Sequence, residues 1–168
     1  MMHYAQMRKF DIANGVGIRT TLFVSGCTHN CPGCFNQDYK AFDYGKQWND
    51  EAETTFMSYV QDENVHGVTV LGGEPMDQTQ DEDLYNLLRQ IKTKTHQTIW
   101  IYSGYTFEMI LQDPKKHRLL EWCDVLVDGL FIETLKDIKL KFKGSSNQNI
   151  IDVPASLAQG EKVLMDIE

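Results

Sequence analysis

The chain has 168 residues, of which 42% are hydrophobic and 24% charged, with a formal net charge of −8 and a pI near 5.1. This composition is typical of a globular protein, and the negative charge argues against a nucleic acid or an anionic membrane as the main partner. No apolar run reaches the roughly 18–20 residues that span a bilayer, and the first ten residues lack the apolar core of a signal peptide. We therefore expect a single domain over residues 1–168.

Short apolar stretches alternate with segments of helical periodicity along the chain. In chain order, the sequence predicts a strand at 20–25, a helix from 49 or 50 to about 61, a strand at 67–71, a helix that starts at 79 or 81, a strand at 98–102, short helices at 107–111 and 114–122, strands at 124–128 and 149–153, and a weakly specified tail at about 154–168. Nearly continuous apolar strands that alternate with helices predict an α/β fold with a parallel sheet. Because a closed eight-stranded barrel takes about 250 residues, we expect a partial, open TIM-like barrel with outer helices.

The loop after the first predicted strand carries three of the four cysteines, Cys27, Cys31 and Cys34, spaced four and then three residues apart. Thiolates this close together hold a metal centre. A structural zinc site normally takes four ligands, and the remaining cysteine, Cys123, lies far away in the sequence. Three thiolates suit a [4Fe-4S] cluster that keeps one iron open for a ligand. Clustered, ligating cysteines also favour the reducing cytoplasm.

Polar and glycine-rich segments follow three further predicted strands, namely Gly72-Gly73-Glu74-Pro75, Ser103-Gly104-Tyr105 and Asp128-Gly129. In barrels and open α/β sheets, the loops at the carboxyl ends of the strands build the site. Glycines let backbone groups approach a small polar ligand, and a carboxylate beside them can receive an ammonium group. We expect these segments and the cysteine loop to meet on one rim.

The spacing Cys27-x-x-x-Cys31-x-x-Cys34 resembles the signature of the radical S-adenosylmethionine superfamily, and Gly72-Gly73-Glu74-Pro75 resembles its methionine-binding segment. The resemblance implies that the three cysteines hold three irons of a [4Fe-4S] cluster and that S-adenosylmethionine binds the fourth. Many members carry an aromatic residue just before the third cysteine, where this chain has Gly33. Adenine contact is therefore expected from the backbone around Gly33 and Cys34 and from Phe35.

Within the superfamily, the chain resembles the glycyl-radical-enzyme activases. The residues that carry this resemblance are Gly15-x-Gly17-x-Arg19, Phe23, Gly26, the three cysteines and Asn36, with Val16 where these activases often have proline. The branch that acts on the anaerobic ribonucleotide reductase is resembled more narrowly, through Cys31-Pro32-Gly33-Cys34 with Asn36, Asp128-Gly129 and Gly144-Ser145-Ser146-Asn147-Gln148. The resemblance further suggests that Ser103, Asp128 and Asn147 contact the ribose or carboxylate of S-adenosylmethionine. Turn or cap hydrogen bonding is the alternative role for each of the three.

The activity implied by this resemblance is reductive cleavage of S-adenosylmethionine to a 5′-deoxyadenosyl radical. That radical takes a hydrogen atom from a glycine on the large subunit of the anaerobic ribonucleotide reductase. Four cysteines are too few for a second cluster, so the electron is expected from a flavodoxin or a ferredoxin-type donor.

Two other readings stay open on the sequence alone. The chain could activate another glycyl radical enzyme, such as pyruvate formate-lyase, or it could be a non-enzymatic metal-binding module. His29 is expected to be an exposed loop histidine rather than a ligand. The lysines at 136, 139, 141 and 143 suit either an acidic partner or an ordinary solvated face.

Overall fold

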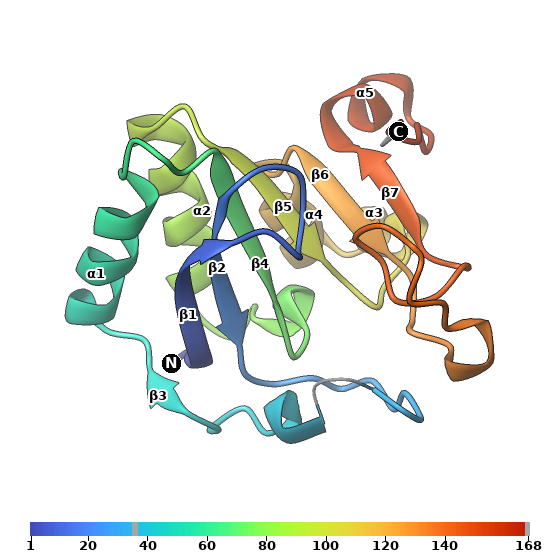
Figure 1. Ribbon diagram of the computed structural model, residues 1–168, viewed down its shortest axis with the longest axis horizontal. Coiled ribbons are helices and arrows are strands. Elements are labelled where there is room, and N and C mark those ends of the chain that lie inside the picture. The colour runs from blue at the N-terminus through green and yellow to red at the C-terminus, as the bar shows by residue number, and fades with distance from the viewer. Residues whose placement is uncertain (35–36, 167–168) are drawn as a thin grey trace.

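The computed structural model describes residues 1–34 and 37–166 and contains a seven-stranded mixed sheet (Figure 1). The strands are β1 (His3–Asp11), β2 (Arg19–Val24), β3 (Lys46–Gln47), β4 (Gly67–Gly72), β5 (Thr98–Tyr102), β6 (Val125–Asp128) and β7 (Asn149–Asp152). The α-helices are α1 (Asp50–Val60), α2 (Asp83–Lys94), α3 (Phe107–Gln112), α4 (Pro114–Leu120) and α5 (Val153–Gln159). Short 3₁₀ turns are η1 (Gln37–Lys40), η2 (Pro75–Asp77) and η3 (Glu133–Leu135).

The sheet is open, with the strand order β3-β1-β2-β4-β5-β6-β7. Strands β2, β4, β5 and β6 run parallel, as the sequence predicts, because helices connect them. The helix boundaries follow local signals: Asn49 caps α1 by accepting a hydrogen bond from the Ala52 amide (2.8 Å), and Pro114 stands in the first turn of α4.

The two faces of the sheet have different coverings. Alternate strand residues such as Leu22, Val70 and Ile101 are buried against α1, α2, α3 and α4, which gather on one face in Figure 1. The intervening residues Trp100 and Val127 belong to a smaller apolar cluster on the opposite face. A cavity lies on this second face of the sheet.

Three features differ from the prediction of a parallel sheet with a loose tail. Strands β1 and β3 were not predicted, and β1 pairs antiparallel with β2. The expected last strand, β7, is antiparallel to β6 because no helix connects the two. The tail contains α5, and its residues 163–165 hydrogen-bond to the outer edge of β7. None of the described helices has the length and apolarity that a membrane crossing requires.

Arg19 ties together the amino ends of the central parallel strands, although it is only 2% exposed. Its guanidinium donates to the carbonyl oxygens of Val68 and Thr98, both at 2.9 Å, and to that of Val16 at 3.0 Å. Burial lowers the pKa of Arg19 to about 10. Gly15 has φ +115°, and a Cβ there would lie 2.7 Å from Arg19 Cδ, so glycine makes room for the side chain.

We predict that Arg19→Met lowers the free energy of unfolding by about 3 kcal/mol, since methionine fills a similar volume and leaves buried carbonyl oxygens without donors. Arg89→Ala, an exposed position on α2, is the control and should change it by less than about 0.5 kcal/mol. Urea unfolding followed by circular dichroism measures both. Equal stability of the two variants would contradict the role given to Arg19.

Candidate metal and cofactor site

Loops at the carboxyl ends of β2, β4, β5 and β6 surround a cavity of about 490 Å³ on the face of the sheet that the helices leave uncovered. The cavity has the size and mixed lining of a small-molecule site. The predicted site residues that line it are Cys27, Cys31, Cys34, Gly72, Gly73, Glu74 and Ser103. The expectation that these segments meet on one rim is confirmed in the structure.

The three cysteines lie in one loop after β2 and are all partly buried, with no disulfide. Burial raises the pKa of the Cys27 thiol to about 11, and the negative charges of Glu74 and Asp77 add to the effect. Burial, followed by the neighbouring Cys34, also raises the pKa of Cys31. Metal binding removes these protons, so the electrostatics of the loop favour a cation that compensates several thiolates.

Glu74 joins three of the loops through its buried carboxylate, which is 1% exposed. Its Oε1 accepts hydrogen bonds from His29 Nε2 (2.8 Å) and the Gly104 amide (2.6 Å). Its Oε2 accepts from Ser103 Oγ (2.8 Å) and the Met76 amide (2.9 Å). Four internal donors therefore already satisfy this carboxylate.

Glycine is needed at positions 72 and 73 because two protein segments approach each other closely there. Gly72 has φ +112°, and a Cβ there would lie 2.5 Å from the Val24 carbonyl oxygen. At Gly73 a Cβ would lie 2.6 Å from the carbonyl oxygen of Gly26. The Glu74 amide donates to that same Gly26 oxygen at 2.7 Å. The glycines thus let the segment after β4 pack directly on the start of the cysteine loop.

His29 is not the exposed loop histidine that the sequence predicts, because its side chain is 14% exposed and bonded to Glu74. This hydrogen bond is the main reason that the pKa of His29 is raised above its usual value. Its ring also packs on Tyr105, with centroids 4.4 Å apart. The loop histidine is therefore a structural link between the cysteine loop and the segment after β4.

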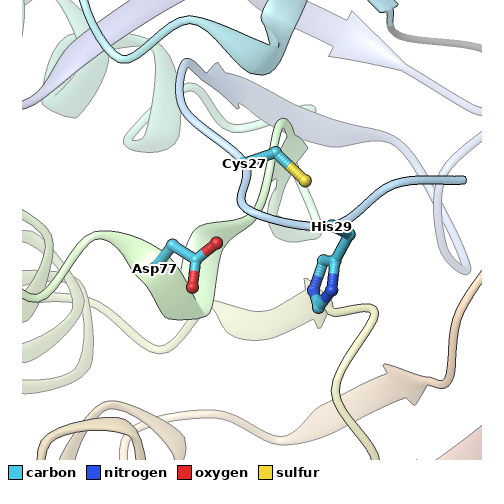
Figure 2. A group of neighbouring side chains, drawn as sticks. All are labelled: Cys27, His29 and Asp77. Carbon is cyan, nitrogen blue, oxygen red and sulfur yellow. The ribbon is translucent and has the colours of Figure 1, made fainter.

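Asp77, in η2, makes a second link to the cysteine loop, and no sequence signal singles it out. Its Oδ2 accepts from both the amide and the hydroxyl of Thr28 at 2.9 Å, and its Oδ1 accepts from Tyr105 Oη at 2.6 Å. Ligand atoms of Cys27, His29 and Asp77 all lie within 4.8 Å of one another (Figure 2). Figure 2 shows Asp77 approaching from the green turn while the other two residues come from the blue loop.

The other predicted cofactor residues that the structure describes, Gly33, Asp128 and Asn147, lie outside the cavity lining. Gly33 has φ +73° and stands against Glu133, and Phe35 falls outside the described residues. Asp128 accepts from the Phe107 amide (2.8 Å) and pairs with Lys162 (3.1 Å), while its buried Oδ1 has no hydrogen-bond partner among the described residues. Gly33 and Asp128 do not line the cavity.

Asn147 also lies outside the cavity lining. Its neighbour Gln148 lines the cavity instead. Asn147 donates to the Leu130 carbonyl oxygen at 2.8 Å, which fits the turn role left open for it. Gln148 lines the cavity, donates to the Gly129 carbonyl oxygen (3.0 Å) and accepts from the Gly144 amide (2.8 Å). The run Gly144–Gln148 contains both residues, and the sequence alone does not indicate which of them faces inward.

Comparison with known proteins identifies one consistent group. The family described as a 4Fe-4S single cluster domain matches residues 13–151. A protein from Vibrio cholerae named anaerobic ribonucleoside-triphosphate reductase-activating protein is 37% identical over 89% of this chain and 97% of its own. Proteins with the same name from Escherichia coli K12 and bacteriophage T4 are 34% and 32% identical, over 88% and 89% of this chain and 96% and 93% of their own.

We predict that Glu74→Gln lowers the free energy of unfolding by about 2–4 kcal/mol, because either amide orientation turns an NH₂ group toward a backbone N–H, that of Gly104 or of Met76. The exposed Glu63→Gln change is the matched control and should be close to neutral. Urea unfolding of the metal-free proteins gives both values. Wild-type stability in Glu74→Gln would show that the carboxylate does not hold the loops together.

Proposed function

This chain belongs to the family of anaerobic ribonucleoside-triphosphate reductase-activating proteins, and we propose that it activates such a reductase by forming a glycyl radical on its large subunit. The observation that carries this proposal is the convergence of three cysteines and the Gly72–Glu74 segment on one cavity. The finer form of the fold that we propose is the partial barrel of radical S-adenosylmethionine enzymes, with the cavity on its inner face.

The residues present fit a [4Fe-4S] cluster and S-adenosylmethionine. Cys27, Cys31 and Cys34 offer three soft thiolate ligands. The remaining cysteine, Cys123, is 3% exposed and lies in the core beneath the helices, away from the cavity. The fourth iron of the cluster would therefore have no cysteine ligand and would be left for S-adenosylmethionine. When bound, the cluster and S-adenosylmethionine supply one-electron cleavage of the sulfonium and abstraction of a hydrogen atom from a glycine Cα.

The protein's own residues hold and shield these groups. Because internal donors saturate Glu74, we assign its carboxylate to holding the loops, and the backbone groups of Gly72 and Gly73, with Ser103, to the methionine end. Asp128 Oδ1 is buried without a hydrogen-bond partner among the described residues, and it is the atom we propose for the ribose. Gly33, Cys34, Phe35 and Asn147 remain proposed for the adenosine end.

The electron comes from outside the chain in this proposal. The cysteines beyond the cysteine loop are limited to Cys123, so a second cluster has no ligands. A flavodoxin or ferredoxin-type protein is the donor class that suits a low-potential cluster. We keep the cytoplasm as the expected location on the same chemical ground, because clustered reduced thiols need a reducing compartment.

The proximity of Cys27, His29 and Asp77 favours one rival, a non-enzymatic module that binds a single ion such as zinc. In that case His29 would give up its bond to Glu74, and Asp77 would give up bonds to Thr28 or Tyr105. It would also leave Cys31 and Cys34 unused at the cavity wall. The cluster uses all three thiols and leaves those bonds intact, so we favour it.

We predict that the iron-loaded protein, incubated without air with the large subunit of the anaerobic reductase, S-adenosylmethionine and a reductant, produces a carbon-centred doublet in electron paramagnetic resonance. The signal should belong to the reductase after the two proteins are separated. Pyruvate formate-lyase serves as the comparison substrate. A radical on that enzyme alone would redirect the function to another activase, and a colourless zinc protein would support the module.

We also predict that Cys31→Ala incorporates no intact cluster and releases no 5′-deoxyadenosine. Cys123→Ala is the matched control, since the Cys123 thiol is buried and bonded to the Leu119 carbonyl oxygen (3.5 Å) away from the cavity. Iron and sulfide analysis together with the visible spectrum measures cluster content. Full iron content in Cys31→Ala would remove Cys31 from the ligand set.

A further inference from the structure

The connection between β6 and β7 is long and contains little regular structure. It runs from residue 129 to 148, and η3 is the 3₁₀ turn within it. Connections of this length without secondary structure of their own are uncommon in compact domains and usually carry a function. Part of this connection lines the cavity, and its other exposed residues, such as Lys139 and Lys141, remain to be explained.

The middle of this connection folds back on itself. Lys136 and Ser145 form an antiparallel bridge, and the Asp137 amide donates to the Gly144 carbonyl oxygen at 3.4 Å. We call residues 136–145 the basic hairpin. Its stem is reinforced by the Ser146 amide, which donates to the Leu135 carbonyl oxygen at 3.0 Å. The tip of the hairpin therefore projects from a paired stem.

Phe142 fixes the basic hairpin to the sheet. Its ring packs edge-on against Trp100, with centroids 5.5 Å apart, and its carbonyl oxygen accepts a 2.6 Å hydrogen bond from Tyr102 Oη. Phe142 has φ +64°, the one non-glycine residue with a positive φ reported for the described chain. Backbone strain of this kind clusters at active sites, ligand-binding segments and switch regions.

The exposed part of the connection is both apolar and basic. Residues 132–139 are all exposed, and Ile138 is 91% exposed, with Leu135 at 41% beside it. Lys139 and Lys141 are exposed on the same hairpin. These exposed apolar side chains lie in the same connection as several lysines, in a chain whose net charge is −8. The hairpin is thus a local positive surface on an acidic protein.

The basic hairpin also borders the entrance of the cavity. Lys136, Asp137 and Ile138 contribute to the cavity lining, whereas Lys139 and Lys141 do not. A protein segment whose backbone enters the cavity can therefore contact the hairpin as well. Because the hairpin adjoins the cavity, a protein whose segment enters the cavity is also the one expected to bind the exposed surface of the hairpin.

We propose that the basic hairpin is the docking surface for the reductase, and that it binds a segment of that protein carrying an apolar side chain flanked by carboxylates. This inference rests on the proposed function and adds the recognition surface to it. Ile138 buries its side chain in the partner, and the lysines steer the acidic segment toward the cavity. The hairpin and the cysteine site thereby act on one substrate.

The test is calorimetric binding of the iron-loaded protein to the large subunit of the reductase at low and high salt. The double variant Lys139→Glu/Lys141→Glu is compared with Lys94→Glu/Lys115→Glu, which makes the same charge change at exposed positions on α2 and α4. We expect about a 10-fold weaker affinity and a smaller salt dependence for the hairpin variant alone. Its cluster spectrum and its 5′-deoxyadenosine release without the reductase should match those of the wild type.

Ile138→Ala is a second variant that leaves the charge unchanged, and it should weaken binding by about 10-fold at both salt concentrations. Wild-type affinity in both hairpin variants, while the wild-type protein binds the reductase and forms its radical, overturns the docking proposal and leaves the proposed function intact. Absence of both binding and radical in the wild type overturns the function, and the docking proposal with it. The hairpin variants could instead bind the reductase normally and lose only binding to phosphatidylglycerol vesicles or self-association. That result would assign the hairpin to a membrane or to a second copy of the chain and would overturn the proposal.

Discussion

The arrangement of the site depends on the buried carboxylate of Glu74. Burying an ionised carboxylate costs several kcal/mol, and that cost is offset only where hydrogen bonds satisfy both oxygens. Here the donors come from the loop after β2 (His29), the segment after β4 (Met76) and the loop after β5 (Ser103 and Gly104). Because one charge needs all four donors, the three loops cannot move independently. The cysteine loop is thereby placed over the cavity before any metal arrives.

A second buried charge performs the equivalent task at the other end of the same three strands. Arg19 starts β2 and donates to carbonyl oxygens of β4 and β5, while Glu74 joins the loops at their carboxyl ends. The two residues have opposite charges and never meet, since a strand length separates them. Their shared effect is to fix the register and the rim of the central parallel strands, on which the cavity is built.

The sequence predicts the central architecture because local patterns determine it. The β-branched run of β2, the helical spacing of Leu84 and Ile91 in α2, and the capping residue Asn49 each act over a few residues. The direction of β7 and the pairing of β1 depend on contacts between distant segments, which no local pattern carries. In the site, cysteine spacing and the glycine pair identify the cavity wall. The bonds of His29 and Asp77 arise only when the loops after β2 and β4 meet, so their roles were beyond prediction.

The strand pairing at the end of the chain has one further consequence. An exposed sheet edge is a template on which another polypeptide can add a strand, and long free edges promote polymerisation. Residues 163–165 occupy the outer edge of β7, whereas at the opposite edge the two-residue β3 pairs only with His3 and Tyr4 of β1. By occupying the edge of β7, residues 163–165 act as an intramolecular block to the addition of a strand from another molecule.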